Sequence, residues 1–452
     1  MALIIVKLAI FLAVVGMFLL VWRIESGWKI ILTPFLFVGY FEFFRIIPPF
    51  FAADLYAGID SPIPFIVASL AFGALLVGFL LVYYMRRSRR SSTSAFAATT
   101  LPQLPFTRET DRRVLFLAAF LSLVGLIFYG GLPPTVKAVF GMLSGTGDLA
   151  SLVSEQRFLL TKGAYFGGEY RGQGLHAAVQ LVGWMLVLSY CVIRWEQFRT
   201  RKSLTILAGA VVLAWMLVAG DGTRGKFLNL LIVAVAAYSL RRPLRPKAVM
   251  IVVASTFALV AALSLYSNKS AAFYTGGKSG VIANAVAKIG ERIFLGNGIS
   301  DVYVIDLVHQ GYFDLRLGAN HFRDFLAALP GVKAPPPLSY EVYLAFNPQG
   351  KGTTFLSGTY ISSAYVDFGI VGIPFLFLAA GATIGYFQRR LFRAAPRPWD
   401  ICVRMVAAIL AANIVAIGFI GFLAQLATLL LIVLLMRVAG SLFSINRHAS
   451  IA

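Results

Sequence analysis

The chain has 452 residues, of which 59 % are hydrophobic and 13 % charged, and its mean hydropathy is +0.81. A water-soluble protein needs more polar surface than this, so the composition excludes a soluble enzyme or binding module. The formal net charge of +21 could suggest a nucleic-acid-binding protein. The basic residues, however, cluster in short loops between apolar segments, as the positive-inside rule requires of a membrane protein, so nucleic acid is not an expected partner.

Apolar runs of about 20 residues recur along the chain, and each is long enough to cross a hydrocarbon core. They predict an all-α polytopic integral membrane protein with about eleven or twelve transmembrane helices, a multi-pass protein of the bacterial inner (plasma) membrane. The predicted spans are 2–22, 28–52, 62–85, 113–132, 176–194, 204–220, 227–240, 248–267, 357–387, 403–418 and 420–436.

The distribution of basic residues predicts the topology of a single membrane domain over 1–452. Segment 86–113 contains seven arginines and is expected to be a basic cytoplasmic linker. The alternation of spans then places 133–175 as the first periplasmic loop and 268–356 as a large periplasmic loop region. The large loop is too rich in aromatic and aliphatic residues to be disordered, so we expect it to fold into short amphipathic helices over the membrane.

One amphipathic helix is predicted from Asn320 to Leu329. Phe322, Phe325 and Leu326 fall on one face at helical spacing, and Asn320 is a suitable residue to cap the helix start. Pro330, followed by glycine, is expected to end it. This helix would lie on a membrane boundary or over a cavity.

The short segment 219–226, Ala-Gly-Asp-Gly-Thr-Arg-Gly-Lys, joins two spans on the predicted outer side. If the second span begins near Thr223, the free N–H groups of its first turn and the Arg224 guanidinium face the same place. Guanidinium groups bind phosphate oxygens in a planar, bidentate way, so the segment is a candidate anion site. The alternative is a plain connecting turn in which Arg224 pairs with Asp221.

Further outer-side arginines and aromatic residues could line an electropositive cleft, in which arginines hold phosphates and aromatic rings stack on sugars. For any one of these arginines, pairing with a neighbouring carboxylate such as Glu291 or Asp324 is the alternative. The residues are Arg157, Arg171, Arg292, Arg316, Arg323, Tyr165, Tyr170, Tyr312 and Tyr340.

Four residues are candidates for a general base toward a sugar hydroxyl: His321, Asp324, Glu341 and Asp367. The residue pattern does not choose among them. The chain has no paired-histidine motif, no DxD-type motif and no nucleotide-binding loop, so neither a metal nor a cofactor is expected.

Three motifs resemble the O-antigen polymerases, the Wzy-type oligosaccharide repeat-unit polymerases. They are Gly222-Thr223-Arg224-Gly225 at the start of a span, Arg323-Asp324 before a proline-rich stretch, and the Ser/Gly-rich segment 358–372 ending in Phe-Gly-Ile-Val-Gly. The resemblance covers roughly residues 150–385.

The resemblance implies a GT-C-like, metal-independent glycosyltransferase with its active site at the periplasmic face. It would transfer a growing glycan from undecaprenyl diphosphate to a lipid-linked repeat unit, as in lipopolysaccharide or exopolysaccharide biosynthesis. Arg224, Arg292 and Arg323 would be the phosphate-binding arginines, with Arg157 or Arg171 a further one.

The implied partners are undecaprenyl-diphosphate-linked oligosaccharides, membrane lipids, a chain-length regulator and a flippase. Two alternatives stay open at this point. One is the O-antigen ligase, which also uses a histidine-containing periplasmic helix. The other is a transporter or flippase of anionic lipid-linked glycans, which would favour inverted repeats that the sequence does not display.

Overall fold

The computed structural model of the chain describes residues 61–84, 105–129, 131–133, 173–218, 224–240, 298–328, 338–346, 359–391 and 397–449, together with a few single residues elsewhere. Every regular element in these ranges is helical, so the predicted all-α class is confirmed for this part of the chain. Among the described helices, five are long and apolar enough to cross a membrane. They are Ile63–Val82, Leu175–Phe198, Arg201–Val218, Tyr360–Leu391 and Ile414–Val438.

Three other predicted spans coincide with described helices that are shorter or more polar. These are α6 (Arg108–Phe128), α11 (Arg224–Ser239) and α18 (Pro398–Ala412). The predicted spans 28–52 and 248–267 lie outside the described residues, as does nearly all of 2–22. The predicted boundary near residue 419 between the last two spans falls beside the kink of α19, where Gly418 has φ +72°. The chain also turns five residues earlier, at Asn413.

The chain forms two compact units. Unit 1 comprises residues 1–97, 271–390 and 411–422, and unit 2 comprises 98–270, 391–410 and 423–452. The long helix α19 (Ile414–Ala449) contributes its first turns to unit 1 and the rest to unit 2.

In unit 2, α9 (Gln173–Phe198) is the central helix and packs against α6, α10 (Arg201–Val218) and α11. The buried Gln180 side chain donates to the Leu121 carbonyl of α6 at 2.8 Å and accepts from the Trp184 indole at 3.0 Å. An ion pair joins the same two helices, since Arg194 donates to both carboxylate oxygens of Asp111 at 2.9 and 3.0 Å. These contacts satisfy polar groups that apolar surroundings would otherwise penalise.

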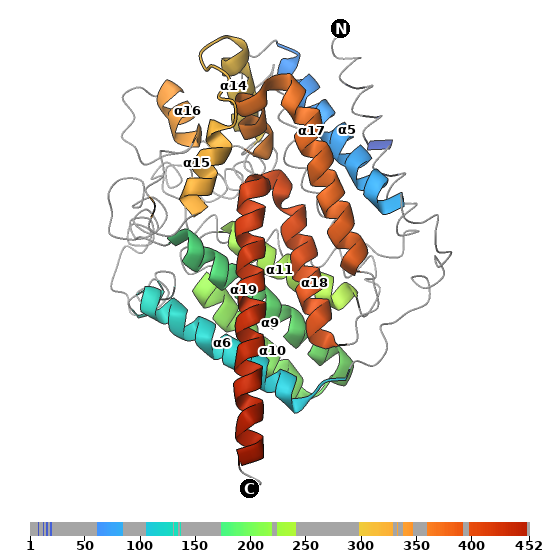
Figure 1. The fold of residues 1–452 in the computed structure, drawn as a ribbon, viewed down its shortest axis with the longest axis vertical. Helices are drawn as coiled ribbons and strands as arrows, with labels where there is room; N and C mark the ends of the chain where they lie inside the picture. The colour runs from blue at the N-terminus through green and yellow to red at the C-terminus, as the bar shows by residue number, and fades with distance from the viewer. Residues whose placement is uncertain are drawn as a thin grey trace, which may run out of the picture. The chain divides into compact units, whose positions relative to one another are not determined.

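In unit 1, α5 (Ile63–Tyr84) lies beside α17 (Tyr360–Leu391), as Figure 1 shows. The two backbones approach so closely that a Cβ on Gly381 would lie 1.9 Å from the Leu75 carbonyl oxygen. A Cβ on Gly78 would lie 2.0 Å from the Leu378 carbonyl oxygen. Gly381 and Gly385 form the small-x-x-x-small spacing that permits such contact between helices in a membrane.

Three short helices gather near the start of α17 (Figure 1): α14 (Gly298–His309), α15 (Ala319–Ala328) and α16 (Leu338–Phe346). They come from the segment predicted as a large loop region with amphipathic helices. Val304 of α14, Val342 of α16 and Val366 of α17 belong to one buried apolar cluster. This cluster holds the short helices against α17 and so positions the residues described next.

Candidate functional site

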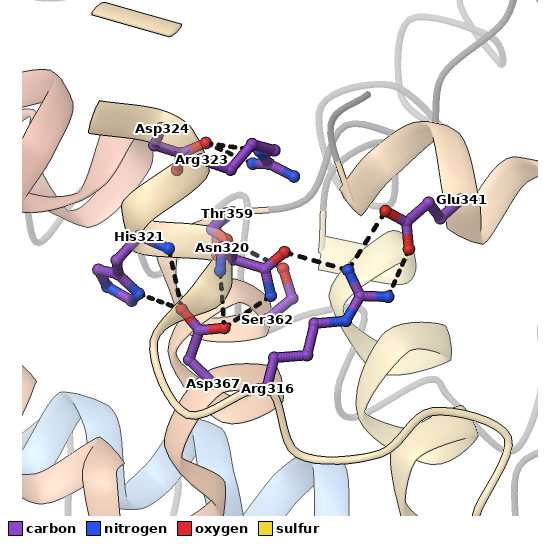
Figure 2. Close-up of polar contacts among 9 residues, drawn as sticks. All are labelled: Arg316, Asn320, His321, Arg323, Asp324, Glu341, Thr359, Ser362 and Asp367. Atoms are coloured by element: carbon purple, nitrogen blue, oxygen red, sulfur yellow. Dashed lines mark hydrogen bonds and ion pairs between the residues drawn. The ribbon is translucent and has the colours of Figure 1, made fainter. Parts of the chain in front are cut away.

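The N-terminus of α15 is capped by a carboxylate from another helix. Asp367 of α17 is fully buried and accepts the backbone N–H groups of Asn320 at 3.1 Å and His321 at 3.0 Å (Figure 2). It also accepts the Asn320 side-chain amide at 2.8 Å. The predicted cap at Asn320 was therefore wrong: Asn320 lies within the helix, because a charged acceptor from α17 satisfies the free N–H groups better than a neutral local amide.

A kink in α17 brings Asp367 to this position. Gly369 has φ +63°, a conformation that glycine adopts without the steric cost of a Cβ, and it interrupts the helix. The interruption frees the Val366 carbonyl from its own helix, and this carbonyl accepts the Arg316 backbone N–H at 2.9 Å. The loop before α15 is thereby attached to α17 just before Asp367.

Asp367 also orients the imidazole of His321. Nδ1 of the ring lies in hydrogen-bond contact with Asp367 Oδ2 (Figure 2). Because a carboxylate only accepts, Nδ1 must carry a proton, and in the neutral ring Nε2 is then left with a lone pair. Nε2 faces the Tyr360 hydroxyl at 3.2 Å. The His321 side chain retains 18 % exposure, whereas Asp367 has none.

Tyr360 is the residue of this arrangement that our sequence analysis missed. It stands seven residues before Asp367 on α17, a spacing of about two turns that places both on one helix face. The Tyr360 ring packs against the kink of α19, where a Cβ on Gly418 would lie 2.7 Å from it. The i, i+7 spacing between Tyr360 and Asp367 was the available sequence signal.

The start of α17 is held by a second buried carboxylate. Asp301 of α14 is fully buried, and its Oδ1 accepts the Thr359 backbone N–H at 2.7 Å. Thr359 in turn caps α17, because its hydroxyl accepts the Ile361 N–H at 3.3 Å. Burial raises the pKa of Asp301 to about 6. This connection fixes the first turn of the helix that carries Tyr360.

The structure pairs the other two candidate bases with arginines. Glu341 of α16 binds the Arg316 guanidinium through both oxygens, and this contact raises the pKa of Arg316 (Figure 2). Asp324 pairs with Arg323, its neighbour on α15. A carboxylate bound to a guanidinium has fewer free lone pairs to offer a sugar hydroxyl. Of the four candidates, His321 therefore has the geometry of a general base, and Asp367 orients it.

Arg323 combines burial with an unused donor. Its side chain is 11 % exposed, and its Nη1 is buried without a hydrogen-bond partner among the described residues. Asp324 occupies only Nε and Nη2. Arg323 follows His321 by two residues on α15, and its buried, unpaired N–H donor is suited to bind an anionic ligand.

The remaining predicted site residues are less completely described. Helix α11 begins at Arg224, next to Thr223, where the candidate anion site needs the span to begin, whereas the span itself was predicted from residue 227. The Arg224 side chain lies outside the described residues. Arg157, Arg171 and Arg292 lie outside them as well. Tyr340 is half-buried on α16, beside Glu341. Within the described part of the chain, no three His, Cys, Asp or Glu side chains come together as a metal site.

No family model, curated protein or solved structure matches this chain. Functional inference therefore depends on the chemistry of the residues and on the motifs described above.

Proposed function

We propose that this protein is a membrane glycosyltransferase, a polysaccharide polymerase that transfers a growing glycan from undecaprenyl diphosphate to a lipid-linked repeat unit at the periplasmic face of the inner membrane. The observation that carries the proposal is the His321–Asp367 pair. A histidine whose Nδ1 is held by a buried carboxylate, and whose Nε2 carries the lone pair and faces the Tyr360 hydroxyl, has the form of a general base.

In the proposed reaction, the acceptor sugar hydroxyl attacks the anomeric carbon of the donor glycan. His321 Nε2 takes the hydroxyl proton as the new C–O bond forms, and Asp367 stabilises the imidazolium. The bond from the anomeric carbon to the diphosphate oxygen breaks, and undecaprenyl diphosphate leaves with the electron pair. For the acceptor to reach Nε2, its hydroxyl takes the place of the Tyr360 hydroxyl.

The departing diphosphate requires positive groups, because negative charge develops on it in the transition state. Among the described residues, Arg323 fits this role, because its buried Nη1 has no hydrogen-bond partner and can donate to a diphosphate oxygen. Arg224 at the start of α11 is the second proposed contributor, together with Arg157, Arg171, Arg292 and Tyr340. The chain uses no metal or cofactor in this proposal, since guanidinium groups supply the charge.

The first experiment compares His321→Ala and Asp367→Asn with His309→Ala in cells that lack the chromosomal gene. His309 is an exposed histidine at the end of α14 and serves as the matched control. General-base catalysis contributes about 100- to 10,000-fold, so both site variants should abolish laddered polymer while membrane protein levels stay normal. His309→Ala should restore the wild-type ladder.

The lipid-linked product that accumulates decides the reaction class. A polymerase defect leaves single repeat units on undecaprenyl diphosphate, facing the periplasm. Accumulation of finished polymer on the lipid carrier would instead indicate a ligase, and repeat units trapped on the cytoplasmic face would indicate a flippase. Wild-type ladders from His321→Ala would exclude His321 as the base.

A further inference from the structure

The position of the membrane boundary along α17 follows from its length and charges. The helix has 32 residues, and Arg389 and Arg390 occupy its last turn. Two adjacent arginines mark the edge of the hydrocarbon at that end. A core of about 30 Å accommodates about 20 helical residues, which places the opposite edge near Gly369. By this count the kink of α17 falls near one edge of the hydrocarbon, which is the outer edge in the predicted topology.

The loop before α15 packs onto α17 at this kink. A Cβ on Gly369 would lie 3.5 Å from the Leu315 side chain. A Cβ on Gly318 would lie 3.4 Å from the Phe368 ring. Together with the hydrogen bond from Arg316 to Val366, these contacts hold the loop at the same depth as Gly369.

The outer surface of this loop is unusually apolar and partly strained. Leu317 is 83 % exposed and Leu315 50 % exposed. Leu317 also has φ +48°, a left-handed conformation that a branched side chain rarely adopts. A water-exposed position of this kind favours glycine or asparagine. On α17, Val371 is 68 % exposed, two residues past Gly369.

We propose that the apolar rim formed by Leu315, Leu317, Phe368 and Val371 is inserted into the hydrocarbon of the bilayer. Leu315 and Phe368 join the rim to the kink of α17, where the exposed apolar residues of that helix begin. Asp314, one residue before Leu315, is exposed, and we expect it on the water side because a carboxylate is costly in hydrocarbon. The acyl chains of the bilayer cover this rim. Their contact with the Leu317 side chain offsets the cost of its left-handed backbone conformation.

The rim also connects the boundary to the His321–Asp367 pair. The centroids of the Phe368 and His321 rings lie 5.4 Å apart with the rings tilted at 51°, and Phe368 directly follows Asp367 in the chain. The pair thus sits at the level where the head group of a lipid-linked donor lies while its tail stays in the hydrocarbon. This last consequence rests on the proposed function, whereas insertion of the rim does not.

The test uses spin labels on Leu317→Cys and Asp314→Cys in the full-length chain. The described native thiols, Cys191 and Cys402, are both buried, so the introduced cysteine is the accessible one in the described part of the chain. An unsubstituted sample sets the background. Each labelled protein is placed in vesicles of phosphatidylcholine and phosphatidylglycerol. Collision rates with oxygen, which partitions into hydrocarbon, are compared with those of a water-soluble nickel chelate.

The label at 317 is expected to collide several-fold more often with oxygen than with the nickel chelate, and the label at 314 should show the reverse. Preferential nickel collisions at 317 would overturn the proposal. So would an immobilised label that neither reagent reaches, because a protein partner or second copy would then cover the rim.

A second variant separates this proposal from the catalytic one. His321→Ala in the Leu317→Cys background removes transfer in the proposed mechanism but should leave the oxygen preference at 317 unchanged. If glycan transfer is lost while the label at 317 still collides preferentially with oxygen, the result supports both the catalytic role of His321 and the insertion of the rim. A wild-type transfer rate with the preference retained leaves the rim in place and removes the catalytic role of His321.

Discussion

At the scale of single residues, Asp367 combines two tasks that are usually separate. Its carboxylate satisfies two backbone N–H groups at the start of α15 and also fixes the proton position of the His321 ring. The helix that presents the histidine is therefore anchored by the same group that orients the histidine. Loss of this carboxylate should therefore disturb both the first turn of α15 and the direction of Nε2.

Asp301 leads to a prediction about pH and stability. Its pKa is raised by burial from 3.8 to about 6, so the folded protein binds this proton more tightly than the unfolded chain does. The resulting stabilisation is complete below about pH 4 and is lost as the pH rises through about 6. Asp301→Asn cannot lose a proton. As the pH rises through this range, the free energy of unfolding of the wild type should therefore fall by up to about 3 kcal/mol relative to that of Asp301→Asn.

The measurement is thermal unfolding of the purified protein in detergent at several pH values between 4 and 7. Asp314→Asn is the matched control, because it removes an exposed aspartate from the same unit. It should follow the wild-type curve. A constant difference between wild type and Asp301→Asn at every pH would contradict the assignment.

At the scale of helices, close contact between α5 and α17 sets the frame for the site. Gly78 of α5 and Gly381 of α17 lie where side chains would meet backbone atoms of the opposite helix. In a bilayer there is no hydrophobic force between helices, so such close packing supplies much of their attraction. The frame matters for function because α17 also carries Tyr360 and Asp367.

Alanine substitutions test this packing. Gly381→Ala brings a methyl group to 1.9 Å from the Leu75 carbonyl oxygen, so the helices must separate. We expect a loss of about 1–3 kcal/mol, observed as a lower unfolding temperature and reduced transfer. Gly73→Ala is the matched control on α5, where a Cβ meets nothing within 4 Å. It should be neutral or slightly stabilising, because alanine favours helix. Equal unfolding temperatures for the two variants would exclude close packing at Gly381.

At the scale of the whole molecule, topology remains a prediction that cysteine labelling can check. Asp314→Cys, in the loop before α15, should react with a membrane-impermeant maleimide in intact cells. Arg201→Cys, at the exposed start of α10, should react only after the membrane is permeabilised. The reason is the positive-inside rule, which places the arginine-rich segment before α10 in the cytoplasm. Reaction of Asp314→Cys only after permeabilisation would reverse the topology.

The amino-acid pattern alone predicts the all-helical membrane class, because about 20 apolar residues can cross a bilayer only as a helix unless a barrel closes around them. It also located α15 to within one residue of its start, Ala319 against the predicted Asn320, since helical periodicity is a local property. It named His321 and Asp367 as candidates from their chemistry. It could not choose between them and Asp324 or Glu341.

The packing of the helices shows which of the candidate residues meet. His321 and Asp367 are 46 positions apart, and their contact depends on the kink at Gly369 and on the apolar cluster that holds α14 and α16 to α17. Arg316 and Glu341, 25 positions apart, pair for the same reason. Such contacts depend on how helices pack, and packing is governed by interactions between distant segments that no local pattern of residues encodes.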